Sequence, residues 1–434
     1  MRVGGSGGRV PGDLGGDGRG VGGSGGATVT VTFERATLAN GLTVVAEVDD
    51  AAHSAACGFF VKTGARDEPA ELMGVSHFLE HMMFKGTATR SAEEINRAFD
   101  DIGARHNAYT TSEITCFHAQ TLPERLGEAV EVLADMLRPA LREEDFSLEK
   151  NVILEEIAMY ADQPFWALYE RVCEARYGGH GLGHRVLGTP ETIRAMPVDA
   201  MREYFRARYS ADNTVVALAG RVNFEEQVRR IESMCGGWAR AGAGRDASAP
   251  GSRPEGIEVE DEGVSRCYLL GLAPAPAAQD EARYAASVLA SAIGDPDSGV
   301  LHWALVEPGL ADEAHCSFEG HDGCGDWALY ATCDPARADE VWRVLVESAA
   351  GAASSMTEDD LVRVKAKAAT AVTLAGERPG GRMQRLGRLW AYFGEYRSLD
   401  EELGRLEAVT LGDVREVATR WPLTPVAQGR LGPG

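Results

Sequence analysis

The sequence of 434 residues lacks an excess of positive charge and lacks long apolar runs. Lysine and arginine number 43 against 66 aspartate and glutamate residues, so the formal net charge is −23 at pH 7. Nucleic acids and anionic membrane surfaces are bound through clusters of positive charge, which this sequence does not contain. No run approaches the roughly 18–20 apolar residues of a membrane-spanning helix. We therefore expect neither a nucleic-acid nor a membrane partner.

The sequence also lacks C-x-x-C pairs, the spacing typical of zinc ribbons and thiol redox motifs. Its eight cysteines are expected to be free, buried thiols in a reducing compartment. Residues 1–27 are rich in glycine and lack the apolar segment of a secretory signal. We expect a flexible tail there and a soluble, cytoplasmic protein.

The length and the composition indicate more than one domain. A chain of this size, with 44% hydrophobic residues, holds two or three domains of the usual length of roughly 100–200 residues. The stretch from Ala239 to Glu255 is rich in Gly, Ala, Ser and Pro and shows no periodicity, as a linker does. We therefore predict an N-terminal domain over 28–238, a linker over 239–257 and a C-terminal domain over 258–434.

One order of elements occurs twice along the chain. The expected strand Thr115–Thr121 runs into Pro123 and a long helix, after which a second helix begins. The expected strand Trp327–Cys333 runs into Pro335 and is followed by the same two elements. This recurrence predicts two homologous α+β domains, each an antiparallel β-sheet with helices packed on one face.

A metal-binding motif lies in the helix expected over Glu71–Phe84. His77 and His81 are four residues apart, so both imidazoles lie on one face of the helix. Glu80 lies beside them, within reach of a metal-bound water. This H-x-x-E-H order inverts the H-E-x-x-H motif and occurs in zinc peptidases. Either histidine alone would more often be a packed core residue, but the combination with Glu80 favours a metal site.

A catalytic zinc ion usually takes three protein ligands and keeps a fourth position for water. The third ligand is expected in the helix over Glu143–Tyr160, which carries Glu149, Glu155 and Glu156. Glu149 and Glu156 are seven residues apart and share a face, whereas Glu155 points about 100° away from Glu156. The alternative for this run is a solvated acidic edge.

These motifs resemble those of the pitrilysin/insulinase family of zinc metallopeptidases. The similarity is greatest to the branch that contains mitochondrial processing peptidase and its bacterial relatives. It extends from about Thr28 to the C-terminus. The matching stretches are Gly74–Thr87, Asn107–Thr110, Asp162–Pro164 and Arg382–Gly387.

The resemblance implies a role for each residue of the motif. His77, His81 and Glu156 would bind one zinc ion per chain, and Glu80 would be the general base. Glu149 would be a carboxylate that supports the ligands from behind.

The resemblance also implies how substrates and partners are bound. Asn107, Ala108 and Tyr109 would form an edge strand that pairs with an extended peptide. The alternative for this stretch is an ordinary strand with one buried tyrosine. Relatives of this length form half of a clamshell chamber, so a homodimer or a heterodimer with a homologous chain is expected.

The implied function is that of a zinc-dependent endopeptidase that hydrolyses peptide bonds in extended peptides or unfolded segments. One feature departs from the family. An arginine and a tyrosine seven residues apart usually help to hold substrate in the second half, and the matching positions here are Leu305 and Asp312. A carboxylate would repel a developing oxyanion. The alternative function is therefore a non-catalytic or partner-dependent subunit of a processing-peptidase-like complex that binds peptides.

Overall fold

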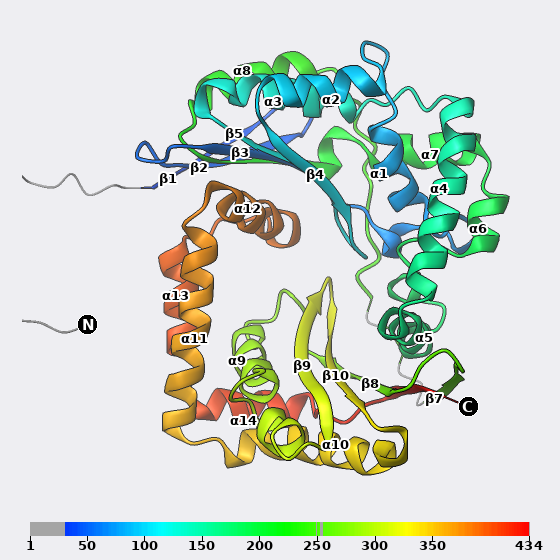
Figure 1. Cartoon of the computed structure of the whole chain (residues 1–434). Coiled ribbons are helices and arrows are strands. Elements are labelled where there is room, and N and C mark those ends of the chain that lie inside the picture. The colour runs from blue at the N-terminus through cyan, green and yellow to red at the C-terminus, as the bar shows by residue number, and fades with distance from the viewer. Residues whose placement is uncertain (1–30, 249, 252–254, 434) are drawn as a thin grey trace, which may run out of the picture.

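The computed structural model describes residues 31–248, 250–251 and 255–433 (Figure 1). The tail predicted over residues 1–27 lies outside the described residues. Within the described part of the chain, none of the helices combines the length and the apolar character that crossing a membrane requires. All eight cysteines are free thiols, and seven of them are buried.

The first half of the chain forms a six-stranded sheet in the order β1-β2-β6-β3-β5-β4. Its strands are β1 (Thr32–Thr37), β2 (Thr43–Val48), β3 (Ala55–Val61), β4 (Arg105–Thr110), β5 (Thr115–Thr121) and β6 (Thr214–Gly220). The turn between β1 and β2 contains Gly41 at φ 90°, a conformation that glycine adopts at no steric cost.

The second half forms a five-stranded sheet in the order β7-β11-β8-β10-β9. Its strands are β7 (Glu255–Glu260), β8 (Cys267–Ala275), β9 (Ala311–His321), β10 (Cys324–Cys333) and β11 (Ala427–Gly432). This order repeats β2-β6-β3-β5-β4 strand for strand, with the same relative directions. The predicted α+β class with two homologous units is therefore confirmed, and β1 is an addition to the first unit.

The expectation of purely antiparallel sheets is wrong in one pair of strands of each unit. β2 runs parallel to β6, and β7 runs parallel to β11. A parallel pair needs a long crossover connection, and in both units several helices lie between the two strands in the chain. Both sheets are therefore mixed.

Eight helices belong to the first half of the chain and six to the second, among the residues described. The first set is α1 (Val75–Met83), α2 (Ala92–Asp101), α3 (Leu126–Met136), α4 (Glu143–Ala161), α5 (Pro164–Tyr177), α6 (Pro190–Ala195), α7 (Val198–Arg208) and α8 (Phe224–Cys235). The second set is α9 (Arg283–Gly294), α10 (Ala338–Ser355), α11 (Glu358–Gly376), α12 (Pro379–Phe393), α13 (Leu399–Ala408) and α14 (Leu411–Arg420). Apart from α5 and α12, each set packs around an apolar core on one face of its own sheet.

The other face of each sheet is covered by a helix from the opposite half of the chain. Met383 and Leu386 of α12 pack against Phe60 of the first sheet. Leu168 of α5 packs against Leu270 of the second sheet. The two helices lie between the sheets in Figure 1, so the expectation of helices on one face only is wrong.

The sequence of the central strands explains why both faces are covered. All seven residues of β3 and all seven of β6 are buried. Helix α12 approaches β3 closely because glycine stands at the contact, where a Cβ on Gly387 would lie 2.1 Å from the Phe60 ring. The predicted boundary at residue 238 lies between the strands of the two sheets, whereas the boundary at residue 258 falls inside β7. Because α5 and α12 each cover the sheet of the opposite half, the two halves are not independently packed units.

Candidate metal centre

Helix α1 begins at Val75, four residues later than expected from the sequence. Gly74 precedes it at φ 94°, in the left-handed region, where the chain turns into the helix. The buried carboxylate of Glu68 accepts the N–H groups of Gly74 and Ser76, each at 2.7 Å. Glu68 therefore caps the helix N-terminus and fixes the direction in which α1 carries its histidines.

Three side chains from α1 and α4 bring metal-binding atoms together. Nε2 of His77 lies 3.7 Å from Oε2 of Glu156, and Nε2 of His81 lies 3.5 Å from the same oxygen. Their ligand atoms all lie within 4.8 Å of one another. Bonds of about 2.0–2.1 Å to a tetrahedral zinc ion would separate ligand atoms by roughly 3.3–3.4 Å. The donor set of two imidazoles and one carboxylate thus fits zinc in both chemistry and spacing.

The protonation of His77 suits a metal ligand. Its side chain is buried, and burial together with the nearby His81 lowers its pKa to about 3. The imidazole is therefore neutral at physiological pH, as ligation requires.

Glu149 lies behind His81, where the resemblance places it. Its Oε1 lies 2.8 Å from Nδ1 of His81, and its other oxygen forms an ion pair with Lys85. A carboxylate bonded to Nδ1 orients the ring and leaves Nε2 free for a metal. Glu155 is exposed on another side of α4, so Glu156 is the carboxylate that meets the histidines.

Glu80 is held by a residue that the sequence analysis did not assign to the site. Oγ1 of Thr110, the last residue of β4, donates a hydrogen bond to Oε2 of Glu80 at 2.6 Å. Burial raises the pKa of Glu80, although this hydrogen bond opposes the shift. The contact joins residues from two different elements, and no spacing in the sequence indicates it.

Strand β4 forms an edge of the described sheet and pairs there with β5. Asn107 is exposed, and its Oδ1 accepts the N–H of Ala108 at 2.9 Å. The hydroxyl of Tyr109 donates to Oε1 of Gln384 in α12 at 2.6 Å. The backbone at Asn107 and Ala108 thus lies on an edge strand, to which a further strand could be added. The Tyr109 hydroxyl, in contrast, is already bonded to α12. Binding of substrate by these residues remains a prediction.

A cleft of about 650 Å³ extends from β4 to the second sheet. Thr110 lies at its end nearest Glu80, and Tyr160, one turn beyond Glu156 on α4, also lines it. Its wall also includes aromatic side chains of α5 and polar side chains of β9, among them Phe165, Trp166, Tyr169, Glu313, His315 and Glu319. None of His77, Glu80, His81 and Glu156 lines this cleft, so it adjoins the metal centre through Thr110, which bonds Glu80.

The two residues that depart from the family pattern, Leu305 and Asp312, are not placed to hold a substrate. Leu305 is completely buried in the core of the second sheet. Asp312 is bonded to Arg266, whose Nε lies 2.6 Å from Oδ2. Neither side chain offers a positive charge or a hydroxyl to a substrate.

Comparison with known proteins matches both halves of the chain. The profile of the insulinase family (peptidase family M16) matches residues 43–190, and that of the M16 inactive domain matches residues 195–368. An uncharacterized zinc protease of Streptomyces coelicolor is 34% identical over 400 residues, which cover 89% of this chain and 86% of that protein. An uncharacterized zinc protease of Bacillus subtilis is 31% identical over 389 residues, with coverages of 89% and 95%.

Solved structures share the fold over most of the chain. A protease from Helicobacter pylori superposes with a TM-score of 0.83 at 20% identity and covers 93% of this chain and 99% of its own. The peptidase M16 inactive domain from Pseudomonas fluorescens superposes with a TM-score of 0.82 at 16% identity, with coverages of 93% and 98%. The chain thus shares the fold of these two proteins over most of its length.

Proposed function

The chain belongs to the insulinase family (peptidase family M16), and from this premise we propose that it is a zinc-dependent endopeptidase. The observation that carries the proposal is the convergence of His77, His81 and Glu156 beside a carboxylate, Glu80, that is fixed by its own hydrogen bond. The names of the relatives support zinc as the metal. We assign one zinc ion to each chain.

The residues of the site divide the chemistry between them. A zinc ion, when bound, would polarise the scissile carbonyl and lower the pKa of a water molecule towards about 7. Glu80 takes a proton from the attacking water and delivers it to the nitrogen of the leaving amine. Thr110 holds Oε2 of Glu80, so Oε1 is the oxygen assigned to the proton transfer. Glu149 keeps the His81 ring in the orientation that ligation needs.

We infer that the substrates are extended peptides or unfolded segments. An extended peptide can add to the edge of the first sheet by backbone hydrogen bonds with β4. Asn107 and Ala108 provide the backbone for this pairing next to Thr110. The side chains of the peptide would then enter the cleft, whose wall carries Trp166 and Glu319.

A partner-dependent subunit is the second candidate function. It is favoured by the positions of Leu305 and Asp312, which supply no group that could stabilise a transition state. Helix α4 also presents an exposed apolar stripe beside Glu156, formed by Leu148, Val152 and Met159 at 69%, 46% and 63% exposure. We propose that this stripe faces a second copy of the chain or a homologous chain.

The test of the proposed function is cleavage of a quenched-fluorescence peptide library by the purified chain. We expect turnover that disappears with a chelator and in Glu80→Gln, while Glu155→Gln, the same change at an exposed neighbour, retains it. Full activity in Glu80→Gln would refute the assignment of the base. If the wild type binds zinc but cleaves no peptide, the result would favour the partner-dependent subunit. Adding a co-purifying chain should then restore turnover.

A further inference from the structure

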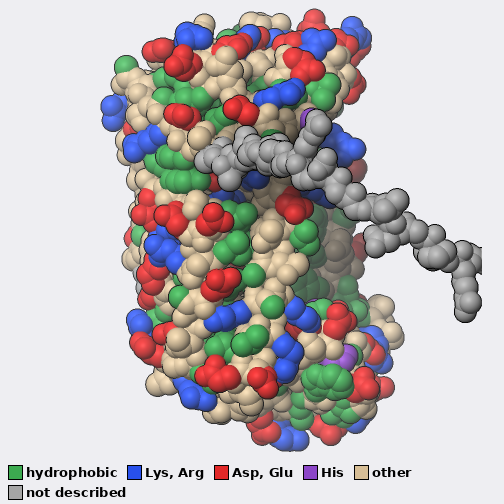
Figure 2. Space-filling model, turned by 90° about the vertical axis from the view of Figure 1, so that its left-hand side faces the viewer, with side chains coloured by type: hydrophobic (Ala, Val, Ile, Leu, Met, Phe, Trp, Pro, Cys, Tyr) green, Lys and Arg blue, Asp and Glu red, His purple; other side chains and the backbone are tan. Residues whose placement is uncertain are grey.

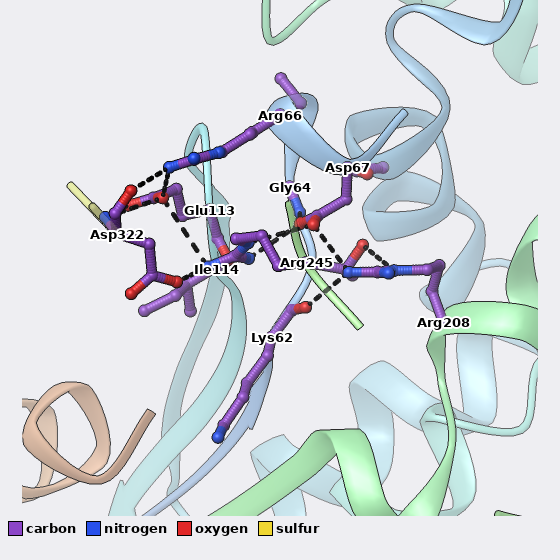
Figure 3. A network of polar contacts seen from close by, with 12 residues as sticks. Lys62, Gly64, Arg66, Asp67, Glu113, Ile114, Arg208, Arg245 and Asp322 are labelled. Carbon is purple, nitrogen blue, oxygen red and sulfur yellow. Dashed lines mark hydrogen bonds and ion pairs between the residues drawn. The ribbon is translucent and has the colours of Figure 1, made fainter. Parts of the chain in front are cut away.

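A buried network of charges joins the two halves of the chain at the end of β4 (Figure 3). It consists of three carboxylates and three guanidinium groups, those of Asp67, Glu113, Asp322, Arg66, Arg208 and Arg245. They come from the segment after β3, the β4–β5 turn, the end of α7, the linker and the β9–β10 turn. The three negative and three positive side chains pair with one another, and this pairing offsets the desolvation cost of burying their charges.

Glu113 connects this network to the second half of the chain. Only 1% of its side chain is exposed. It accepts hydrogen bonds from Nη1 of Arg66 at 2.7 Å and from the hydroxyl of Tyr392 in α12 at 2.8 Å. It also accepts the N–H of Asp322 at 3.1 Å, and Nδ1 of His321 lies 3.5 Å away. Three of these four partners belong to the second half.

Arg245 holds the linker inside the same network. Its Nε and Nη2 donate to the carboxylate of Asp67 at 3.0 and 2.8 Å, and its Nη1 donates to Asp322 at 2.6 Å. It also donates to the backbone carbonyl of Glu113. The linker at this point therefore binds the first half to the β9–β10 turn instead of spacing them apart.

The β4–β5 turn transmits this attachment to the metal centre. The N–H of Arg66 donates to the carbonyl of Ser112 at 2.8 Å, which holds the turn from the first half. Glu113 holds it from the second half. Thr110, three residues before Glu113, is the residue that bonds Glu80. A displacement of the turn would therefore displace the hydroxyl that orients the base.

We propose that Glu113 is a positioning residue: it fixes the β4–β5 turn against the second half and thereby holds Thr110 on Glu80 and β4 beside the cleft. Its kinetic consequence rests on the proposed peptidase function. The placement of β4 itself does not, and it can be measured without turnover.

The kinetic test is a double-mutant cycle of Glu113→Gln and Thr110→Val, read as kcat/KM with zinc saturating. Because an error of 1 Å in an active site can cost about 100-fold, we expect Glu113→Gln to lower kcat/KM by roughly 10–100-fold. If Glu113 acts through Thr110, the double variant is no slower than the slower single variant. Multiplicative losses would show that Glu113 acts independently of Thr110 and would overturn the proposal.

The second test is hydrogen exchange over residues 105–116, which needs no activity. Tyr392→Phe removes one hydrogen bond to Glu113 without leaving an unpaired charge, so it should fold even where Glu113→Gln does not. Glu47→Gln is the matched control, because Glu47 is also buried and accepts hydrogen bonds from Arg385 and Tyr396 of the second half, but lies on β2, far from β4 in the sheet.

We expect faster exchange over 105–116 in Tyr392→Phe and in Glu113→Gln, and wild-type exchange there in Glu47→Gln. Equal exchange in all variants, or the same acceleration in Glu47→Gln, would overturn the placement of β4 by Glu113. If the wild type cleaves no peptide but exchange follows the expected pattern, the peptidase proposal fails and the positioning of β4 stands.

Discussion

Replacement of Glu149 by alanine tests whether the residue behind a ligand governs metal affinity. Glu149 accepts from Nδ1 of His81 at 2.8 Å, pairs with Lys85 and is almost completely buried. Without it, the ring of His81 loses the hydrogen bond that orients Nε2 towards Glu156, and Lys85 loses its partner. No ligand is removed by this change.

Loss of a carboxylate bonded to a ligating histidine typically costs about 10–100-fold in metal affinity. We expect the Kd for zinc to rise by that factor in Glu149→Ala, which corresponds to about 1.4–2.7 kcal/mol. The assay is competition for zinc against a chromogenic chelator of known affinity at fixed pH. Glu155→Ala, on the exposed side of the same helix, is the control and should bind zinc as the wild type does.

An unchanged Kd in Glu149→Ala would refute this reasoning, because it would mean that packing alone orients His81. An equal loss in Glu155→Ala would indicate a general effect of negative charge on α4 in place of the hydrogen bond.

Two further predictions concern stability. Gly387→Ala should lower the free energy of unfolding by about 1–3 kcal/mol in denaturant titrations, because the added Cβ overlaps the Phe60 ring. Gly351→Ala, in open space on α10, should not lower it, and equal losses would contradict the packing argument. The second prediction concerns His321. Burial lowers its pKa, but contacts with negative groups outweigh this and raise it above the usual 6.5; these groups are Glu113, Glu319 and Asp326. Because its pKa is raised in the folded state, protonated His321 stabilises the folded protein below pH 6.5. This stabilisation is lost as the pH rises through the folded-state pKa. Between pH 6 and pH 9 the wild type should therefore lose more unfolding free energy than His321→Asn, and equal losses would contradict the assignment.

Patterns in the sequence predicted those features of the protein that are formed by residues close together in the chain. The spacing of His77 and His81 fixes their common face, and the helical period distinguishes Glu156 from Glu155. The duplication was visible because strand, proline and helix recur in the same order. The family resemblance added the choice of Glu156 as ligand and the place of Glu149.

Contacts between distant segments could not be predicted in this way. Thr110 meets Glu80 only because β4 ends beside α1, and Glu113 meets Tyr392 only because α12 returns to the first sheet. No periodicity in the sequence indicates that α5 and α12 each cover the sheet of the opposite half. The continuously apolar sequence of β3 does indicate a strand that is buried on both faces. The parallel pairs of strands likewise follow from the path of the chain between them.

The most direct test of the central claim is the zinc content of the purified chain after dialysis against metal-free buffer, measured by mass spectrometry of the metal. The account predicts one zinc ion per chain in the wild type, in Glu80→Gln and in Glu155→Gln, and a large loss in Glu156→Gln. Retention of one zinc ion by Glu156→Gln, or a wild-type chain that binds none, would contradict the assignment of His77, His81 and Glu156 as the metal centre.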